Sequence, residues 1–180
     1  MIKISENIHL KLISDSDLES LFTLMKDIYP PAYSHFWTDN GAWYLNSQYC
    51  KENILKELLE EKADYYFIFY NNEIVGNFRI LWDENLKGVC LEKQVKLHRL
   101  YLHQKIQGKG IGKKLVFWLE EKARANNYQT IWLDAMNEQE QSFQFYKKLG
   151  YKYHSHIFLP FVLMHDRVRK MNQIYKLLTK

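Results

Sequence analysis

The chain has 180 residues and a formal charge of +4, with 47% hydrophobic and 26% charged residues, as in an ordinary soluble globular protein. A domain of this length buries about 70% of the surface of its unfolded chain. The modest positive charge suits an anionic ligand but is too weak to indicate a nucleic acid. No segment approaches the ~18 uninterrupted apolar residues of a membrane span, and the first 14 residues lack the long apolar run typical of a signal peptide. We therefore expect a cytoplasmic protein with no nucleic-acid and no membrane partner.

The chain shows no repeat and no linker rich in Pro, Gly or Ser, so we expect a single domain over residues 1–180. Only two cysteines occur, Cys50 and Cys90, and neither has a metal-ligand partner at a standard spacing, so we expect no metal site. The aromatic content is high, with 13 Tyr, 10 Phe and 5 Trp, and much of it precedes residue 83. That excess indicates a pocket wall or a partner surface as well as a core.

The N-terminal part begins with alternating apolar residues over 8–12, which predict a strand. Ser14 or Ser16 can cap a helix with apolar residues on one face, and Pro30-Pro31 is expected to stop it. Residues 32–49 are rich in aromatics and show no regular period, so we expect an irregular segment. A second helix follows around residues 54–59.

The central part alternates strands and helices. Residues 65–70 and 74–82 predict a hairpin across the Asn71-Asn72 turn. A strand over 95–102, a helix over 110–125 and a strand over 130–133 predict a right-handed crossover between parallel strands.

The C-terminal part is expected to contain a helix over 140–149 that ends at Gly150, and then two short strands over 151–164. From Asp166 onward the spacing of apolar residues predicts a terminal helix. The whole order indicates the α/β class, with hairpins before and after the crossover.

A glycine-rich turn joins the strand over 95–102 to the following helix, as Gln107-Gly108-Lys109-Gly110-Ile111-Gly112. Without Cβ atoms the backbone can turn sharply and come close to a ligand. The first amides of the helix have no intrahelical partner and, with the helix dipole, form a site for a pyrophosphate. Nearby lysines, with no acidic residue between Glu92 and Glu120, add positive charge. Four interpretations of this turn remain open on the sequence: a dinucleotide site, a Walker-type loop, a coenzyme A cradle, and a turn without a ligand. The G-x-G-x-G spacing departs from the G-x-G-x-x-G of a dinucleotide site. Lys114 follows Gly112-Lys113 at the position where a Walker-type loop needs Ser or Thr.

Two motifs resemble the signatures of the GNAT superfamily of N-acetyltransferases. Arg99-Leu100-Tyr101-Leu102 followed by residues 107–112 is similar to the Gln/Arg-x-x-Gly-x-Gly/Ala signature, and Phe145-Tyr146-Lys147-Lys148-Leu149-Gly150-Tyr151 is similar to the second one. The resemblance covers about residues 65–160. It implies a mixed, centrally splayed β-sheet flanked by helices, with acetyl-CoA as cosubstrate.

The resemblance also implies roles for individual residues. The backbone of Leu100 and Leu102 would hold the acyl-pantetheine, with the Leu102 amide as the oxyanion donor. Tyr146 would be the general acid, since a phenol with a pKa of about 10 can protonate a thiolate whose acid has a pKa of about 8.5. The cofactor-binding residues implied are Leu100, Tyr101, Leu102, Gln107, Gly108, Lys109, Gly110, Ile111, Gly112, Lys113, Gln139 and Tyr146.

The general base is the part of the site that the resemblance does not supply. Some members of the family have a Glu where this chain has Lys96, and a lysine is a poor base unless burial depresses its pKa. If the strand alternates regularly, His98 and Glu92 share its face, and we name His98 as the candidate catalytic base because of its pKa class. Loss of the proton through ordered water is the alternative.

The acceptor is expected beneath the N-terminal helices, among the aromatic residues of segment 29–44 and Asp39. Aromatic faces and a carboxylate can hold an ammonium group, which favours a small-molecule primary amine such as a polyamine or an amino sugar. The alternatives are a protein or peptide amine, a core function for these aromatics, or a non-catalytic acyl-CoA sensor. The presence of Tyr146 counts against a sensor. A homodimer is a further expectation.

Overall fold

The computed structural model describes residues 1–178 and contains one eight-stranded sheet in the order β1-β2-β3-β4-β5-β6-β8-β7. The strands are β1 (Ile2–Ser5), β2 (Ile8–Leu12), β3 (Ala63–Tyr70), β4 (Glu73–Trp82), β5 (Gln94–Leu102), β6 (Thr130–Met136), β7 (Lys152–Phe158) and β8 (Lys170–Leu177). The helices are α1 (Leu18–Tyr33), α2 (Ala42–Gln48), α3 (Lys51–Leu58), α4 (Ile111–Ala125) and α5 (Glu140–Lys148). The predicted α/β class, with a mixed sheet flanked by helices, is confirmed.

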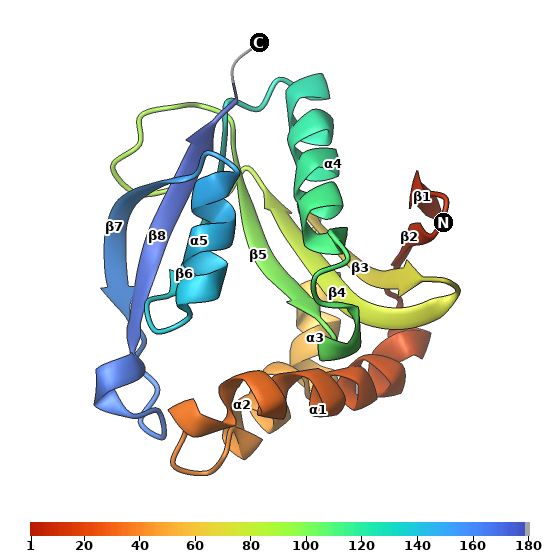
Figure 1. Cartoon of the computed structure of the whole chain (residues 1–180), viewed down its shortest axis with the longest axis vertical. Helices are drawn as coiled ribbons and strands as arrows, with labels where there is room; N and C mark the ends of the chain where they lie inside the picture. The colour runs from red at the N-terminus through yellow and green to blue at the C-terminus, as the bar shows by residue number, and fades with distance from the viewer. Residues whose placement is uncertain (179–180) are drawn as a thin grey trace.

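The sheet separates two hydrophobic cores. One core packs α4 and α5 on the sheet around Leu97, Leu115 and Ile131. The other packs α1, α2 and α3 on the opposite side around Met25, Ile54 and Phe67. In Figure 1, α4 lies along β5 and α5 lies in front of β6 and β8, while α1 and α2 gather below the lower ends of the strands.

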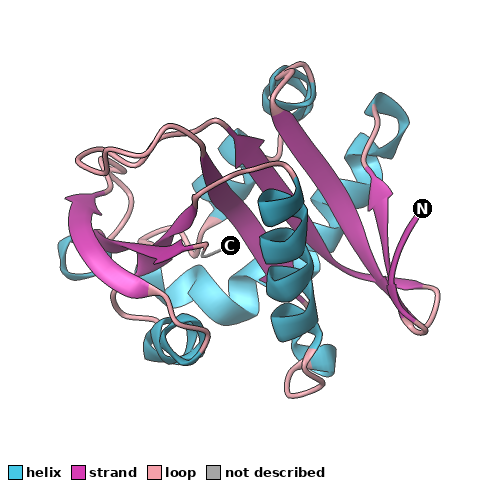
Figure 2. Ribbon diagram, turned by 90° about the horizontal axis from the view of Figure 1, so that it is seen from above, coloured by secondary structure: helices cyan, strands magenta, loops and turns pink. Residues whose placement is uncertain are grey.

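The sheet opens at its centre, between β5 and β6. These parallel strands pair only from Gln94↔Thr130 to Lys96↔Trp132. The helix between them is α4, so the predicted connection of two parallel strands through a helix is confirmed. The two strands meet at the top of Figure 1 and diverge downward, and from above the strands spread into two groups (Figure 2). Beyond Lys96, the edge of β5 that faces β6 is therefore free of sheet pairing.

A β-bulge in β5 decides which side chains face each core. The pairing with β4 passes from Arg79↔Arg99 to Ile80↔Leu97, so His98 is the extra residue. Because of this extra residue, Leu97 and Leu100 face the same core, while Tyr101 faces the other one. The regular alternation that the sequence pattern predicts for this strand is wrong at His98.

Three expectations for the N-terminal part are corrected. Helix α1 continues through Pro30 and Pro31 to Tyr33. The prolines lack the two backbone N–H groups that would bond to the carbonyls of Lys26 and Asp27. Both of these residues are exposed, so their carbonyls can bond to water instead. The segment expected to be irregular contains helix α2, and strand β1 precedes the first strand that was predicted.

The predicted C-terminal helix is also wrong. Apart from a short turn of 3₁₀ helix at Asp166–Val168, the segment forms strand β8, which pairs antiparallel with both β6 and β7. Both faces of β8 are partly covered, so its buried residues do not alternate cleanly with exposed ones. Only one strand, β7, forms within residues 151–164, and the rest of that segment is a loop.

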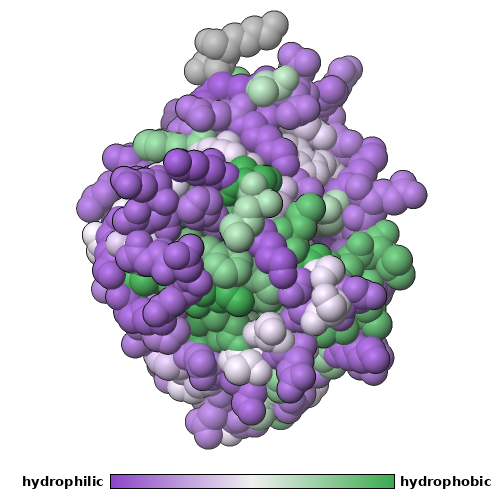
Figure 3. All heavy atoms as spheres, turned by 90° about the vertical axis from the view of Figure 1, so that its right-hand side faces the viewer, coloured by the Kyte–Doolittle hydropathy of each residue, from purple (hydrophilic) through white to green (hydrophobic). Residues whose placement is uncertain are grey.

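The face that carries the N-terminal hairpin is mostly hydrophilic, with apolar side chains gathered toward its middle (Figure 3). In the part of the chain that the structure describes, no helix is long and apolar enough to cross a membrane.

Candidate active site

The glycine-rich turn forms an open cradle at the N-terminus of α4. Gly108 and Gly110 have positive φ angles of 77° and 71°, and a Cβ atom at either position would meet nothing within 4 Å. The first intrahelical bond runs from the Lys114 amide to the Gly110 carbonyl at 3.2 Å, so the amides of residues 111–113 precede it. The Ile111 side chain is buried and anchors this turn to the core. The turn therefore offers backbone donors and space to an anionic group.

The other predicted residues of the turn surround this cradle. Gln107 ends a short 3₁₀ turn and is exposed, as are the Lys109 and Lys113 side chains that rest over aromatic rings. Gly112 lets α5 come close, since Phe145 lies 3.4 Å from the position that a Cβ atom would occupy. The two lysines raise the positive potential around the turn.

The free edge of β5 exposes backbone groups toward the opening. The His103 amide donates to the Val75 carbonyl at 2.8 Å, and Gly76 pairs with Leu102. Hydrogen-bonded pairs alternate with non-hydrogen-bonded pairs along an antiparallel ladder. Because His103 bonds to Val75, the next pair, Gly76↔Leu102, is non-hydrogen-bonded, and so is Phe78↔Leu100. The backbone N–H and C=O groups of Leu100 and Leu102 therefore point away from β4, toward the opening. The role that the resemblance implied for these two residues needs such free backbone groups and stays a prediction.

A cavity of about 270 Å³ occupies the opening and continues between the sheet and α1 and α2. It joins the free edge of β5 to the aromatic residues of the N-terminal part. The predicted residues that line it are Leu100, Tyr101, Gln139, Tyr146 and His98. Leu102 and the glycine-rich turn lie outside its lining.

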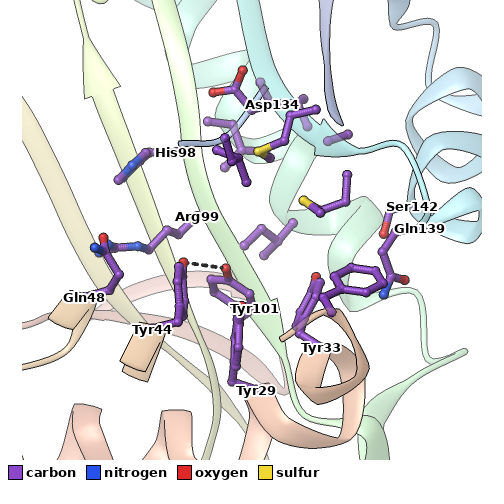
Figure 4. A pocket seen from close by; sticks show the side chains of 18 of the residues that line it. Tyr29, Tyr33, Tyr44, Gln48, His98, Arg99, Tyr101, Asp134, Gln139 and Ser142 are labelled. Atoms are coloured by element: carbon purple, nitrogen blue, oxygen red, sulfur yellow. Dashed lines mark hydrogen bonds between the residues drawn. The ribbon is translucent and has the colours of Figure 1, made fainter. Parts of the chain in front are cut away.

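Tyrosines form one wall of this cavity. The Tyr29 ring stacks on Tyr33, with ring centres 4.8 Å apart, and on Tyr44, at 4.5 Å. The Tyr44 and Tyr101 hydroxyls are 3.2 Å apart. Figure 4 shows these four side chains along one side of the cavity, with Asp134 on the opposite side. The Tyr101 side chain thus packs with the core on the side away from the glycine-rich turn, and its contact with the cofactor stays a prediction.

Tyr146 and Gln139 lie where α5 meets the opening. Tyr146 is buried, and burial, followed by the nearby Tyr33, raises the pKa of its hydroxyl above the ordinary value. Its hydroxyl therefore keeps its proton at neutral pH. The Gln139 amide nitrogen donates to the Ala32 carbonyl at 3.1 Å, which ties the start of α5 to α1 and leaves the amide oxygen of Gln139 for other partners.

His98 lines the cavity, but its environment disfavours the proposed role as a base. Its Nδ1 atom faces the Arg79 guanidinium, which can only donate, so the remaining proton is on Nε2. Burial, together with the charges of Arg99, Arg79 and Lys96, lowers the pKa of His98 to about 2. The ring is therefore a neutral donor and a very weak base. Glu92, the other candidate, is exposed and precedes β5.

Two ion pairs flank the cavity, one buried and one partly exposed, and the sequence pattern did not identify them. The Arg99 guanidinium donates to the Glu57 carboxylate, and Lys96 Nζ lies 2.8 Å from Asp134 Oδ2. The other Asp134 oxygen accepts from the Gln173 amide at 3.1 Å. Asp134 had a signal in the sequence, as a charged residue within an apolar strand, whereas the pair of Glu57 and Arg99 joins distant segments. Lys96 is therefore a paired cation, and its position does not supply a base.

A loop over residues 159–165 covers the acceptor side of the cavity. The Thr38 amide donates to the Leu163 carbonyl at 2.9 Å, and the His165 amide donates to the Phe36 carbonyl at 2.9 Å. Trp37 forms an isolated bridge with Met164. In Figure 1 this blue loop lies against the orange segment after α1. We call residues 159–165 the roof.

The cradle, the free strand edge and the cavity define an enzyme that holds an acyl-coenzyme A beside an acceptor pocket. The residues present fit acetyl-CoA, because the open glycine turn suits its pyrophosphate and the backbone of β5 suits its pantetheine arm. The chain belongs to the GNAT acetyltransferase family, since the family model "Acetyltransferase (GNAT) family" matches residues 19–151. It is an acetyl-CoA-dependent N-acetyltransferase.

One curated relative is an uncharacterized N-acetyltransferase encoded in the pepI 3' region of Lactobacillus delbrueckii subsp. lactis. It is 22% identical over 152 residues, which cover 82% of this chain and 86% of the relative.

Solved structures show the same fold at low sequence identity. PaiA N-acetyltransferase of Thermoplasma acidophilum, in complex with coenzyme A, is 19% identical with a TM-score of 0.71, over 94% of this chain and 98% of that chain. RimL, a ribosomal L7/L12 α-N-protein acetyltransferase in complex with coenzyme A, is 16% identical with a TM-score of 0.72, over 98% of this chain and 97% of that chain. A spermidine N-acetyltransferase from Vibrio cholerae, in complex with coenzyme A and spermine, is 14% identical with a TM-score of 0.68, over 97% of each chain.

Proposed function

We propose that this enzyme acetylates the primary amine of a small molecule. The observation that carries the proposal is the roofed cavity that joins the free edge of β5 to the tyrosine wall. Its volume of about 270 Å³ is near the lower end of the range for small-molecule sites. The fold alone does not choose the acceptor, because structures of this shape include a spermidine and a ribosomal-protein acetyltransferase.

A protein or peptide acceptor is less well supported by this geometry. An extended peptide needs a continuous trench, and the bonds between the roof and residues 36–38 bridge the acceptor side. A non-catalytic sensor of acyl-CoA would need neither Tyr146 in the cavity lining nor a tyrosine wall beside it. The cytoplasmic location, the single domain over 1–180 and the homodimer stay predictions from the sequence.

In the proposed reaction, the amine nitrogen attacks the thioester carbonyl carbon, a C–N bond forms and the C–S bond breaks. The Leu102 amide donates to the carbonyl oxygen as negative charge grows there. Tyr146 donates its hydroxyl proton to the departing thiolate, and solvent then restores that proton. Once the C–N bond has formed, the nitrogen loses one proton to solvent, which balances the proton that Tyr146 regains, and the products are the amide and the free thiol. An acceptor that arrives as an ammonium group loses one further proton before it attacks.

The amine loses its proton to solvent water in this proposal. A lysine-like amine with a pKa of about 10.4 is neutral in roughly one molecule in 2,500 at pH 7. The aromatic and aliphatic walls of the cavity disfavour the charged ammonium form of a bound amine. Both oxygens of Asp134 are engaged, by Lys96 and Gln173, so this carboxylate is not set up as the base.

The experiment that tests the proposal measures thiol release from acetyl-CoA with a panel of small amines, amino sugars and N-terminal peptides. We expect turnover with at least one small amine, and a product that gains one acetyl group by mass spectrometry. Acetyl-CoA hydrolysis without amine is the background to subtract. Turnover of peptides alone, or binding of acetyl-CoA without turnover of any amine, would contradict the proposal.

A further inference from the structure

The acceptor end of the cavity has a wall of stacked aromatic rings. Tyr29 is stacked between Tyr33 and Tyr44, and Tyr101 meets Tyr29 edge-on at 6.2 Å. From the roof side, Phe161 packs on Trp37 with ring centres 5.7 Å apart. Flat rings of this kind pack best against another flat or apolar body, by offset stacking or edge contacts.

The same end of the cavity lacks a free negative charge. Asp134 is the one carboxylate among the described residues that line the cavity, and Lys96 neutralises it at 2.8 Å. Arg99 also lines the cavity, and its buried guanidinium is balanced by Glu57, which lies outside the lining. Asp39 was predicted to lie near the acceptor. Its carboxylate instead accepts hydrogen bonds from the backbone amides of Gly41 and Trp43 at the start of α2.

A polyamine would bring further ammonium groups into this surrounding. Each needs a carboxylate or water, because an unpaired charge loses its hydration on burial. A second ammonium group in this cavity would meet the Arg99 guanidinium and the uncharged amide of Gln48, which lie together at the left of the cavity in Figure 4. At the right of the cavity it would meet the uncharged side chains of Gln139 and Ser142. The pocket therefore favours one amino group and penalises a second.

From these two features we infer that the acceptor is a compact monoamine with an aromatic body, such as an arylalkylamine, and that polyamines are poor acceptors. This inference rests on the proposed function and narrows it. It replaces the expectation of a polyamine, which depended on the aromatic residues and on a free carboxylate at Asp39. The reaction is unchanged: the amine gains the acetyl group and the thiol leaves.

Two matched pairs of amines test the inference with the wild-type enzyme and acetyl-CoA. Butylamine and 1,4-diaminobutane differ in one charge, and we expect kcat/KM at least tenfold higher for butylamine. Phenethylamine and butylamine differ in the ring, and we expect kcat/KM at least tenfold higher for phenethylamine. Spermidine should be used no better than 1,4-diaminobutane. Equal or better use of either polyamine would overturn the inference and leave the proposed function standing.

One isosteric variant tests the charge argument separately. Gln48→Glu places a carboxylate at the far end of the cavity, and we expect the ratio of kcat/KM for 1,4-diaminobutane over butylamine to rise at least fivefold. The matched control is Gln129→Glu, at an exposed position outside the cavity lining, which should leave the ratio unchanged. An unchanged ratio in Gln48→Glu, with circular dichroism like the wild type, would contradict the inference. Turnover of no amine, with acetyl-CoA still bound, would instead overturn the proposed function itself.

Discussion

At the scale of single residues, Tyr146 is the group on which the proposed proton transfer depends. Its hydroxyl is buried in the cavity lining, and burial raises its pKa above the ordinary value. The hydroxyl therefore stays protonated at neutral and mildly alkaline pH, and a rise of rate with pH in that range would reflect deprotonation of the amine. The raised pKa also makes Tyr146 a weaker acid, which limits its share of the rate enhancement.

We expect Tyr146→Phe to lower kcat by about one to two orders of magnitude, because the leaving thiolate loses its proton donor. The ring stays in place, so the affinity for acetyl-CoA should remain near that of the wild type in a titration. Tyr153→Phe, at a half-exposed tyrosine on β7, is the matched control and should keep full turnover. Unchanged turnover in Tyr146→Phe would remove this residue from the mechanism.

At the scale of elements, the start of α4 is the part that holds the cofactor. Gly110 has φ 71° and borders open space, so a side chain there would enter the volume proposed for the pyrophosphate and also strain the backbone. We expect Gly110→Val to lower affinity for acetyl-CoA by at least a hundredfold, measured by calorimetry.

The control for this variant is Gly88→Val, since Gly88 has φ 86° and lies in the loop before β5. It introduces similar backbone strain away from the cradle. If Gly88→Val and Gly110→Val lost the same affinity for acetyl-CoA, the loss would be due to lower stability. The assignment of the glycine-rich turn as the pyrophosphate site would then be wrong.

Elements with local signals could be predicted from the sequence. The glycine-rich turn, the hairpin of β3 and β4 and the crossover through α4 follow from spacing and turn residues within a few positions. Strand β8 could not, because it is partly covered on both faces and takes its structure from two neighbouring strands. The bulge at His98 had no local signal either, and it invalidated the alternation on which the assignment of a base depended.

The candidate site divides in the same way. Its cofactor side is made of contiguous residues, so the motifs of residues 99–112 and 145–151 indicate it from the sequence alone. Its acceptor side is made of side chains from distant segments, and neither the pairing of Lys96 with Asp134 nor the roof could be derived from spacing.

At the scale of the whole molecule, acetyl-CoA should stabilise the fold by bridging both halves of the split sheet. A ligand that binds only the folded chain at 100 times its Kd adds about 2.7 kcal/mol to the free energy of unfolding. For a chain of this size we expect the melting temperature to rise by about 5–10 °C in a thermal scan. An acetyl thioester without the nucleotide is the control and should give little shift. No shift at saturating acetyl-CoA would contradict the assignment of the cofactor.

The roof has a consequence for how enzymes of this design can diversify. It is joined to residues 36–38 by backbone bonds, and neither segment belongs to the cradle or to the free edge of β5. Changes in the length or composition of these two loops can therefore alter acceptor choice while the cofactor contacts stay intact. Each loop donates hydrogen bonds to the other, so a redesign of acceptor specificity should exchange the two loops together.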